Sequence, residues 1–376
     1  MTKNILAIAI AAAVMAPSAF AAATVYGVAH ESINSFSSVS DGADTPSSTG
    51  LTSLSSNSSR LGIKGSEDLG AGMKAVYQME FSVNMDGESG TSGLGGAARN
   101  TFIGLGGGFG TVLAGRHDSL IKMTGRKYDL FGDQVGNNRN ILRMSLPTAV
   151  TNASDISTFA VDGRHNNVLA YISPTWSGFH FGAAYVPSSA TTQNETYDNA
   201  TFKAAALTAL ADYTVGNFSA TLGYINIDNG SSALTGLGAT REAFTAYRLG
   251  AGYTFGAAKV VGLYQNAAIG GAVNAKQDTY GLGGSYKVGA AGTVKAQYYM
   301  AGNNSAQADT NGTLTTVGYD HALSKNTTAY AVYAAAHNAA NAGYTTDMAS
   351  GGSGSVVTAI TGKDNSALSV GIIHNF

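Results

Sequence analysis

The sequence contains no cysteine among its 376 residues, so no disulfide bond can hold the folded chain together. Charge is also scarce: Asp, Glu, Lys and Arg make up 12% of the residues, against about 25% in a typical soluble domain. The 21 basic and 23 acidic residues nearly balance, which excludes the strongly basic surface that nucleic-acid binding requires. Beyond the first residues, no stretch approaches the roughly 20 apolar residues of a membrane-spanning helix. A disulfide-stapled domain, a nucleic-acid-binding protein and a helical membrane protein are therefore excluded.

Glycine and tyrosine are abundant instead. The 49 glycines are nearly twice the usual share of about 7%. Nineteen Tyr and 14 Phe accompany a single Trp. Few charges, many Gly and Tyr, and no Cys describe an outer-membrane β-barrel better than a secreted enzyme.

The first 21 residues have the pattern of an export signal. Lys3 gives a positive start, an unbroken apolar run covers 5–15, and Ala19 and Ala21 satisfy the small-x-small rule for cleavage. The run is too short to span a bilayer as a stable helix. We expect residues 1–21 to be removed so that the mature chain begins at Ala22, with cleavage after Ala23 as the alternative.

Several later segments alternate between apolar and polar residues with a period of two, as strands do. In 245–255 one face carries Tyr247, Leu249, Ala251, Tyr253 and Phe255, and the other Arg248, Gly250, Gly252 and Thr254. In the last strand one face carries Leu368, Val370, Ile372, His374 and Phe376, with Ile373 as the exception on the opposite face. Such segments suit a barrel wall with lipid outside and water inside, although a soluble sandwich also alternates.

The connections between these segments are unequal. Short ones are 68–72, 106–108, 174–178, 215–217, 256–258, 288–292 and 321–326. Long ones alternate with them: 36–57, 84–98, 117–163, 187–200, 228–241, 267–275, 301–311 and 337–362. This order predicts an all-β, antiparallel transmembrane β-barrel of about 16 strands over residues 22–376, with short periplasmic turns and long extracellular loops. A barrel of that size leaves an aqueous channel.

The connection 117–163 is the longest, and loops of that length are usually functional or disordered. It is rich in charge and also carries apolar Leu130, Phe131, Ile141 and Leu142, which could pack it down. We expect this third loop to fold into the barrel and narrow the channel. The alternative is an ordinary exposed loop with a small apolar cluster.

Six further pieces stand in a recognisable order: 24–28 (TVYGV), 59–70 (SRLGIKGSEDLG), 73–80 (MKAVYQME), 99–105 (RNTFIGL), 108–116 (GFGTVLAGR) and 164–174 (RHNNVLAYISP). Together with the end, 370–376 (VGIIHNF), they resemble the trimeric general diffusion porins of Gram-negative bacteria, especially the neisserial and Burkholderia-like branch. The match is dense at both ends and in the first half, whereas 200–361 matches mainly in periodicity.

The resemblance implies a constriction in which basic residues of the wall face acidic residues of the third loop. Motif by motif, Arg60, Arg116 and Arg164 take the wall positions, and Asp129 and Asp133 take the acidic positions. The family's Pro-Glu-Phe-Gly sequence is absent from this loop. Parity supports Arg60, which opposes Leu61 and Ile63, but it is ambiguous for Arg116.

Phe376 is the expected assembly signal, because an aromatic residue ending an apolar strand face must pair with the first strand to remove the sheet edges. The resemblance further implies passive diffusion of ions and small hydrophilic solutes through a homotrimer in the outer membrane. Outer-membrane lipid, lipopolysaccharide and the barrel-assembly machinery are the expected partners, without nucleic acid.

Three other functions are alternatives to a general diffusion pore: a substrate-selective channel, an enzyme and an adhesin. A substrate-selective channel would share the architecture, but Tyr128 and Phe131 alone make a poor aromatic track. No catalytic constellation, metal motif or cofactor motif supports an enzyme, and an adhesin would not need a large lumen.

The expected constriction also predicts an ion preference. Three permanent cations facing two carboxylates predict a mild preference for anions.

Overall fold

The computed structural model describes residues 23–37, 39–40, 51–87, 98–144, 161–187, 205–228, 244–270, 274–347 and 358–376. The expected signal segment, 1–21, lies outside these ranges. Among the described residues, no helix is both long and apolar enough to cross a membrane.

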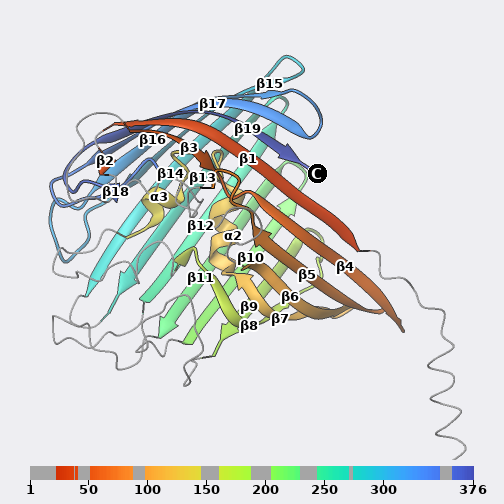
Figure 1. The fold of residues 1–376 in the computed structure, drawn as a ribbon. Helices are drawn as coiled ribbons and strands as arrows, with labels where there is room; N and C mark the ends of the chain where they lie inside the picture. Colours follow the sequence, from red (N-terminus) through yellow and green to blue (C-terminus); the bar gives the residue numbers. More distant parts are fainter. Residues whose placement is uncertain are drawn as a thin grey trace, which may run out of the picture.

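One antiparallel sheet contains nearly all the described strands (Figure 1). Its strands are β1 (Thr24–Ser37), β3 (Leu51–Ser56), β4 (Arg60–Gly70), β5 (Met73–Ser82), β6 (Ala98–Gly107), β7 (Gly110–Asp118), β8 (Arg164–Ile172), β9 (Phe179–Val186), β10 (Ala205–Val215), β11 (Phe218–Asp228), β12 (Phe244–Phe255), β13 (Ala258–Ile269), β14 (Ala275–Val288), β15 (Gly292–Ala301), β16 (Gly312–Ala322), β17 (Thr327–Asn338) and β19 (Asn365–Asn375). A separate pair joins β2 (Val39–Ser40) to β18 (Thr358–Ala359).

The sheet closes on itself. From β4 to β17 each strand pairs with the next, and β17 pairs with β19. β1 closes the ring, because it pairs with β19 on one side and with both β3 and β4 on the other. Because β3 and β4 share one position beside β1, the seventeen strands of the sheet occupy sixteen places around the ring. The predicted barrel of about 16 strands is therefore confirmed.

Short turns gather at one end of the barrel, as predicted. Two residues join β4 to β5, β6 to β7, β10 to β11, and β12 to β13. The other end carries the long connections, which include the third loop between β7 and β8.

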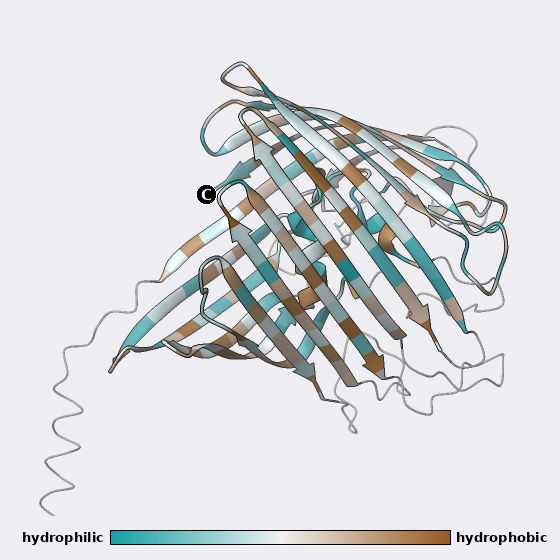
Figure 2. Ribbon diagram, turned by 180° about the vertical axis from the view of Figure 1, so that it is seen from behind, coloured by the Kyte–Doolittle hydropathy of each residue, from teal (hydrophilic) through white to brown (hydrophobic). Residues whose placement is uncertain are grey.

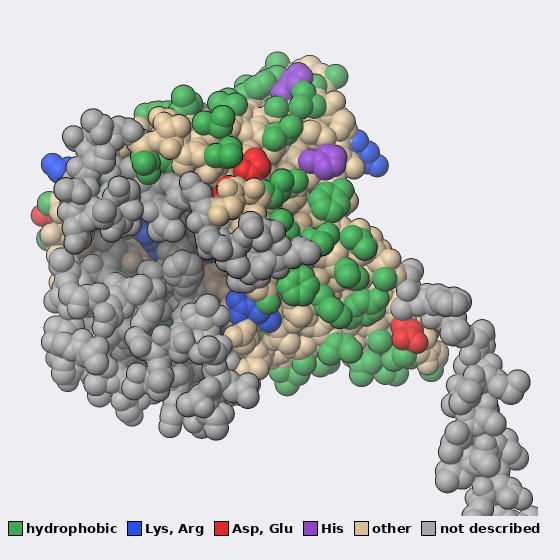
Figure 3. All heavy atoms as spheres, viewed as in Figure 1, with side chains coloured by type: hydrophobic (Ala, Val, Ile, Leu, Met, Phe, Trp, Pro, Cys, Tyr) green, Lys and Arg blue, Asp and Glu red, His purple; other side chains and the backbone are tan. Residues whose placement is uncertain are grey.

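The two faces of the wall differ as the alternation predicted. In β19, Leu368, Val370 and Ile372 are 52%, 56% and 46% exposed, whereas Ala367 and Ser369 are 1% and 0% exposed. Hydrophobic residues alternate with polar ones along the strands in Figure 2, and hydrophobic side chains cover much of the outer surface in Figure 3. An apolar exterior of this kind faces lipid.

The described parts of the third loop, 117–144 and 161–163, lie inside the ring. They contain α2 (Leu120–Lys127) and α3 (Arg139–Leu142), which Figure 1 places between the walls of the barrel. Three of the four apolar side chains expected to pack the loop down are buried: Phe131 and Ile141 are 0% exposed and Leu142 is 1% exposed, whereas Leu130 is partly buried. The prediction that apolar residues pack this loop into the barrel is confirmed.

The second strand of the ring is interrupted between β3 and β4, a feature that the sequence pattern did not predict. Ser58 has a positive φ of 56°, which breaks the extended backbone. The Asn57 amide donates to the His30 carbonyl at 2.8 Å, and the Ser59 hydroxyl accepts from the His30 amide at 2.9 Å. The Ser59 side chain thus takes the place of a backbone carbonyl in one hydrogen bond between this strand and β1.

The seam of the barrel ends at Phe376. Its amide donates to the Gly27 carbonyl at 3.1 Å, and its carbonyl accepts from the Gly27 amide at 2.9 Å. The Phe376 ring lies over Gly27, where a Cβ would stand 2.3 Å from the ring. Only glycine at position 27 leaves room for this ring.

Removing Phe376 should therefore reduce the amount of folded barrel. The deletion loses two backbone hydrogen bonds at the point where the ring must close, and Phe376→Ala should have a smaller effect because it loses only the ring. Heat-modifiable mobility in gels of outer membranes measures the folded fraction.

Phe255 provides a matched control, because it is 52% exposed against 55% for Phe376 and lies away from the seam. Phe255→Ala should assemble normally. Equal assembly of the Phe376 deletion and the unaltered protein would contradict the prediction.

Candidate pore constriction

The third loop is fastened along one side of the lumen, from β10 to β16. The Lys127 ammonium contacts the Asp212 carboxylate of β10 at 2.5 Å, and the Tyr128 hydroxyl bonds the Thr221 hydroxyl of β11 at 2.9 Å. Further along, the Gly136 carbonyl accepts from Gln297 of β15 at 3.1 Å and from Thr316 of β16 at 2.8 Å. The loop therefore covers this half of the wall.

Two wall glycines make the seat for α2 and the residue after it. A Cβ on Gly223 of β11 would stand 2.6 Å from the Thr124 hydroxyl oxygen, and one on Gly250 of β12 would stand 2.1 Å from the Tyr128 ring. Side chains at these positions would push the helix away from the wall. The glycine content of the inner face thus serves the close approach of the loop.

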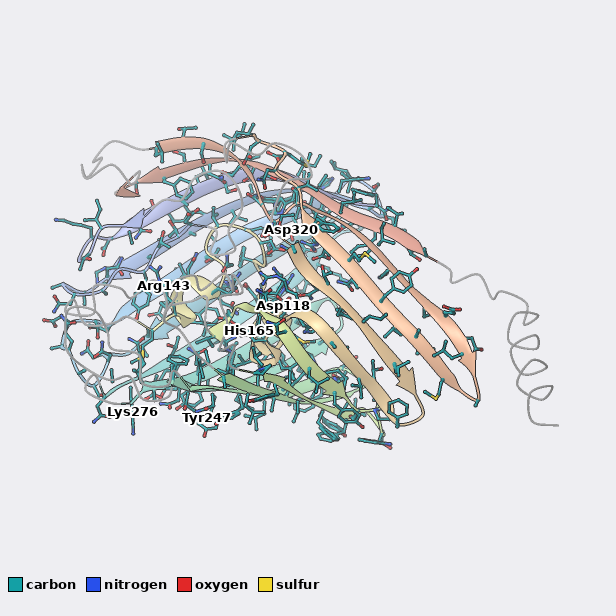
Figure 4. The ribbon with its side chains drawn as sticks, turned by 60° about the horizontal axis from the view of Figure 1, so that its bottom comes forward. Asp118, Arg143, His165, Tyr247, Lys276 and Asp320 are labelled. Atoms are coloured by element: carbon teal, nitrogen blue, oxygen red, sulfur yellow. The ribbon has the colours of Figure 1, made fainter. Side chains whose placement is uncertain are left out.

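Basic residues line the opposite side of the lumen, on β4, β6 and β8. Arg99 pairs with Glu80 of β5 at 2.6 Å, and Arg164 pairs with Asp118 at the end of β7 at 2.9 Å. Arg60 reaches Asp133 of the third loop at 3.4 Å. Figure 4 shows Asp118 inside the barrel, whereas Tyr247 and Lys276 lie at its outer margin.

Arg126 connects the two sides. It projects from α2, and its guanidinium lies 3.8 Å from Asp118 and 3.7 Å from Asp133. Its side chain is 41% exposed, whereas those of Arg60, Arg99 and Arg164 are 19%, 8% and 13% exposed. Arg126 is therefore the most accessible of these arginines.

The structure brings together three of the five predicted constriction residues: Arg60, Arg164 and Asp133. Asp129 lies within the same loop, but its carboxylate accepts the backbone amides of Phe131 at 3.0 Å and Asn138 at 3.2 Å. These bonds stabilise the turn of the loop and do not reach the wall arginines.

Arg116 stands at the loop end of β7, on the parity of exposed Ala114. Its Nε donates to the Ala98 carbonyl at 2.8 Å, and its guanidinium also contacts the Asn166 amide oxygen. A register shift between β7 and β8 falls at this position, between Gly115 and His117.

Sequence reasoning missed Arg126, Asp118, Arg99 and Glu80 as members of this cluster. Glu80 lies on the polar parity of its strand with Gln78, so its inward direction was readable from the alternation. Arg126 carried no such signal, because its direction depends on a helix in a loop that has no periodic wall to define a face.

The charged side chains of the cluster carry a net positive charge. Four arginines, Arg60, Arg99, Arg126 and Arg164, face three carboxylates, Glu80, Asp118 and Asp133. Lys122 adds a further basic group at 2.8 Å from Asp118, and burial lowers the pKa of its ammonium to about 7. The excess of positive charge does not depend on Lys122.

Asp133 keeps its charge despite its position. Burial would raise the pKa of its carboxyl group, but the nearby Arg126 and Arg60 outweigh burial and hold this pKa below its ordinary value. The carboxylate therefore persists as a fixed negative charge beside the two arginines.

A second connection reaches the third loop from the end of β17. Its Thr346 carbonyl accepts from the Gly136 amide at 2.8 Å, and its Gly343 carbonyl contacts the Arg143 guanidinium. Tyr344, 1% exposed, lies against Gly312 of β16, where a Cβ would stand 2.5 Å from its ring. The third loop is thus held from the wall and from this connection.

Among the described residues, no group of three His, Asp or Glu side chains could hold a metal ion. A closed ring of sixteen strand positions with an apolar exterior, and a cluster of charged side chains inside, defines a transmembrane pore of the outer-membrane type.

The chain belongs to the Gram-negative porin family, whose model matches residues 7–341. It is 32% identical to outer membrane porin protein 32 of Delftia acidovorans over 335 residues, 88% of each chain. It is 32% identical to the major outer membrane protein P.IB of Neisseria lactamica over 189 residues, 50% of each chain. Among solved structures, the anion-selective porin from Comamonas acidovorans matches 95% of this chain and 100% of its own, at 25% identity and a TM-score of 0.73.

The expected fold, family and location are therefore confirmed: the protein is a diffusion channel of the Gram-negative outer membrane. The relatives of this family are channels and not enzymes.

The lowered pKa of Asp133 predicts that its charge survives acidification. A depressed pKa means that the carboxylate, and the stability it adds beside the arginines, is lost only when the pH falls below the folded-state value. At about pH 4, an ordinary Asp with a pKa near 3.9 would be roughly half protonated.

Asp133→Asn should shift the reversal potential from that of the unaltered channel by nearly the same amount at neutral pH and at about pH 4. Planar-bilayer recordings under a salt gradient measure this difference. If the difference falls to half or less at the lower pH, Asp133 titrates like an exposed acid and the described pairing is wrong.

Proposed function

We propose that the chain is a general diffusion pore with a mild preference for anions, and that Arg60, Arg126, Arg164 and Asp133 set this preference. The main observation behind this proposal is the excess of arginines over carboxylates at the candidate constriction. Arg126 is the most accessible of these arginines. Arg116 and Asp129 belong to the proposed site less directly, as a rim charge and as a turn-stabilising group.

The physical basis is a field across the channel. Arginine remains charged at any relevant pH, and rings of charged side chains are a common source of selectivity in pores. Conduction also requires weak interactions at several sites, since a tightly bound solute would block the channel. Most of the wall arginines are already paired with carboxylates, which weakens their hold on a passing anion.

A substrate-selective channel is the second candidate, and the aromatic residues of the third loop argue against it. Tyr128 and Phe131 are 1% and 0% exposed, and they pack against the wall. Neither ring is available to a passing sugar. We therefore favour passive diffusion of ions and small hydrophilic solutes, with no enzymatic activity and no cofactor.

The remaining expectations are part of the same proposal. Residues 1–21 act as an export signal that precedes the barrel of 22–376, on the pattern of the first residues. The family resemblance supports a homotrimer, contact with outer-membrane lipid and lipopolysaccharide, and insertion by the barrel-assembly machinery with Phe376 as its signal.

Liposomes that contain the purified protein should swell in isotonic solutions of small sugars and remain unswollen in large dextrans. A water-filled lumen passes the sugars, and the constriction excludes the dextrans. Protein heated before reconstitution serves as the control. Absence of swelling with correctly folded protein would overturn the proposed pore.

Charge substitutions should move the selectivity in opposite directions. Arg126→Gln, Arg60→Gln and Arg164→Gln should shift the reversal potential towards cations, with the largest shift for Arg126, while Asp133→Asn should shift it towards anions. All shifts should shrink as the Debye length falls from about 30 Å at 0.01 M salt to about 3 Å at 1 M.

Lys259→Gln at the turn end of β13 is the control for loss of one positive charge away from the constriction. If it shifts the reversal potential as much as Arg126→Gln, the preference reflects the net charge of the protein and not the proposed site.

A further inference from the structure

Arg248 is a buried charge that the constriction itself does not explain. It lies on the inner face of β12 and is 0% exposed, the largest of the fully buried side chains. Burying an arginine is costly unless it is paired and fully hydrogen-bonded. Its contacts therefore indicate what the protein gains from it.

All five N–H donors of the guanidinium are used. Nη1 and Nη2 form a two-pronged pair with the Asp162 carboxylate at 2.6 and 3.0 Å, and Nη1 also donates to the Ile121 carbonyl at 3.1 Å. Nε and Nη2 donate to the Gln265 side-chain oxygen at 3.0 and 2.5 Å. This geometry exploits the planar fork that distinguishes arginine from lysine.

Gln265 extends the contact to a third part of the loop. It lies on β13, 1% exposed, and its side-chain nitrogen donates to the Leu142 carbonyl of α3 at 2.6 Å. Arg248 and Gln265 together thus hold α2 through Ile121, α3 through Leu142, and the returning segment through Asp162. These three points span the described parts of the third loop from its first helix to its last residues.

The sequence of α2 fits this contact. Gly125 is the sixth of the eight residues of the helix, where glycine is unfavourable relative to alanine. A Cβ at this position would stand 2.6 Å from Nη1 of Arg248. The glycine thus makes room for the guanidinium, and the next residue is Arg126.

We propose that Arg248, with Gln265, is a positioning residue that sets the ion preference of the pore without touching the solute. It fixes α2 against β12 and so fixes Arg126 at its distance from Asp133 and from the wall arginines. The inference rests on the proposed selective pore. It adds that the selectivity depends on the contacts of Arg248 and Gln265 with the loop, on the far side of the lumen from Arg60 and Arg164.

A charge-neutral double substitution separates position from charge. Arg248→Gln with Asp162→Asn removes one positive and one negative charge, so the net charge of the lumen does not change. It also avoids leaving either partner buried and unpaired, which a single substitution would do. The loop should loosen, and Arg126 should sample a wider range of positions.

The expected result is a fall of about twofold in the anion-to-cation permeability ratio, together with greater noise in the open-channel current. Gln265→Met, which removes the link to Leu142 and changes no charge, should produce a smaller shift in the same direction. Trypsin provides a structural readout, because cleavage after Arg126 or Lys127 should be faster in the double variant reconstituted in membranes.

The matched control is His337→Gln with Asp364→Asn, which removes another pair, 2.7 Å apart, whose side chains are 68% and 59% exposed. This variant should behave as the unaltered channel. An unchanged permeability ratio and unchanged noise in a folded double variant would overturn the positioning role of Arg248. The proposed pore would not be affected by that result. If the double variant does not fold, an unchanged ratio in Gln265→Met has the same consequence.

The unaltered protein, recorded in the same experiment, separates the two proposals. If it conducts without any ion preference, the proposed selectivity fails. If it conducts with a preference that the double variant retains, only the positioning role of Arg248 fails.

Discussion

Closure of the sheet is the constraint on which the rest of the structure depends. In lipid no water can satisfy backbone N–H and C=O groups, so a spanning sheet must have no free edge. The pairing of β1 with β19 meets this requirement, and its register runs from Val28 opposite Asn375 to Ser37 opposite Ser366. Once the ring has sixteen places, its interior is too wide to be filled by wall side chains alone, and a loop can enter it.

The inserted loop brings charged side chains into the lumen, and the two sides of the wall contribute differently. Small residues such as Gly223 and Gly250 allow the loop to approach β11 and β12 closely, whereas the opposite strands carry Arg60 and Arg164. On the side of β11 and β12, the charges that face the lumen come from the docked loop. On the opposite side, they come from the arginines of the wall itself.

The fold was largely predictable from the sequence, because strand alternation and turn length are local properties. The alternation of 368–372 and the short connection at 256–258 both reappear in the structure. The break at Ser58 and the register shift beside Arg116 were not predictable, since they depend on contacts with residues distant in sequence. Arg60 could be assigned from the family resemblance with the support of strand parity, whereas the position of Arg126 and the contacts of Arg248 depend on the docked loop.

Pairing of the charges explains how one site can be both stable and permeable. An unpaired buried arginine would be costly, and an unpaired exposed one would hold anions strongly. The protein divides these roles among its arginines: Arg248 is fully buried and uses every donor on the protein itself, whereas Arg126 is partly exposed and meets Asp118 and Asp133 only at 3.8 and 3.7 Å. The first can hold the loop, and the second can act on ions because its field is incompletely cancelled. A selective pore of this kind therefore needs buried charges as well as accessible ones.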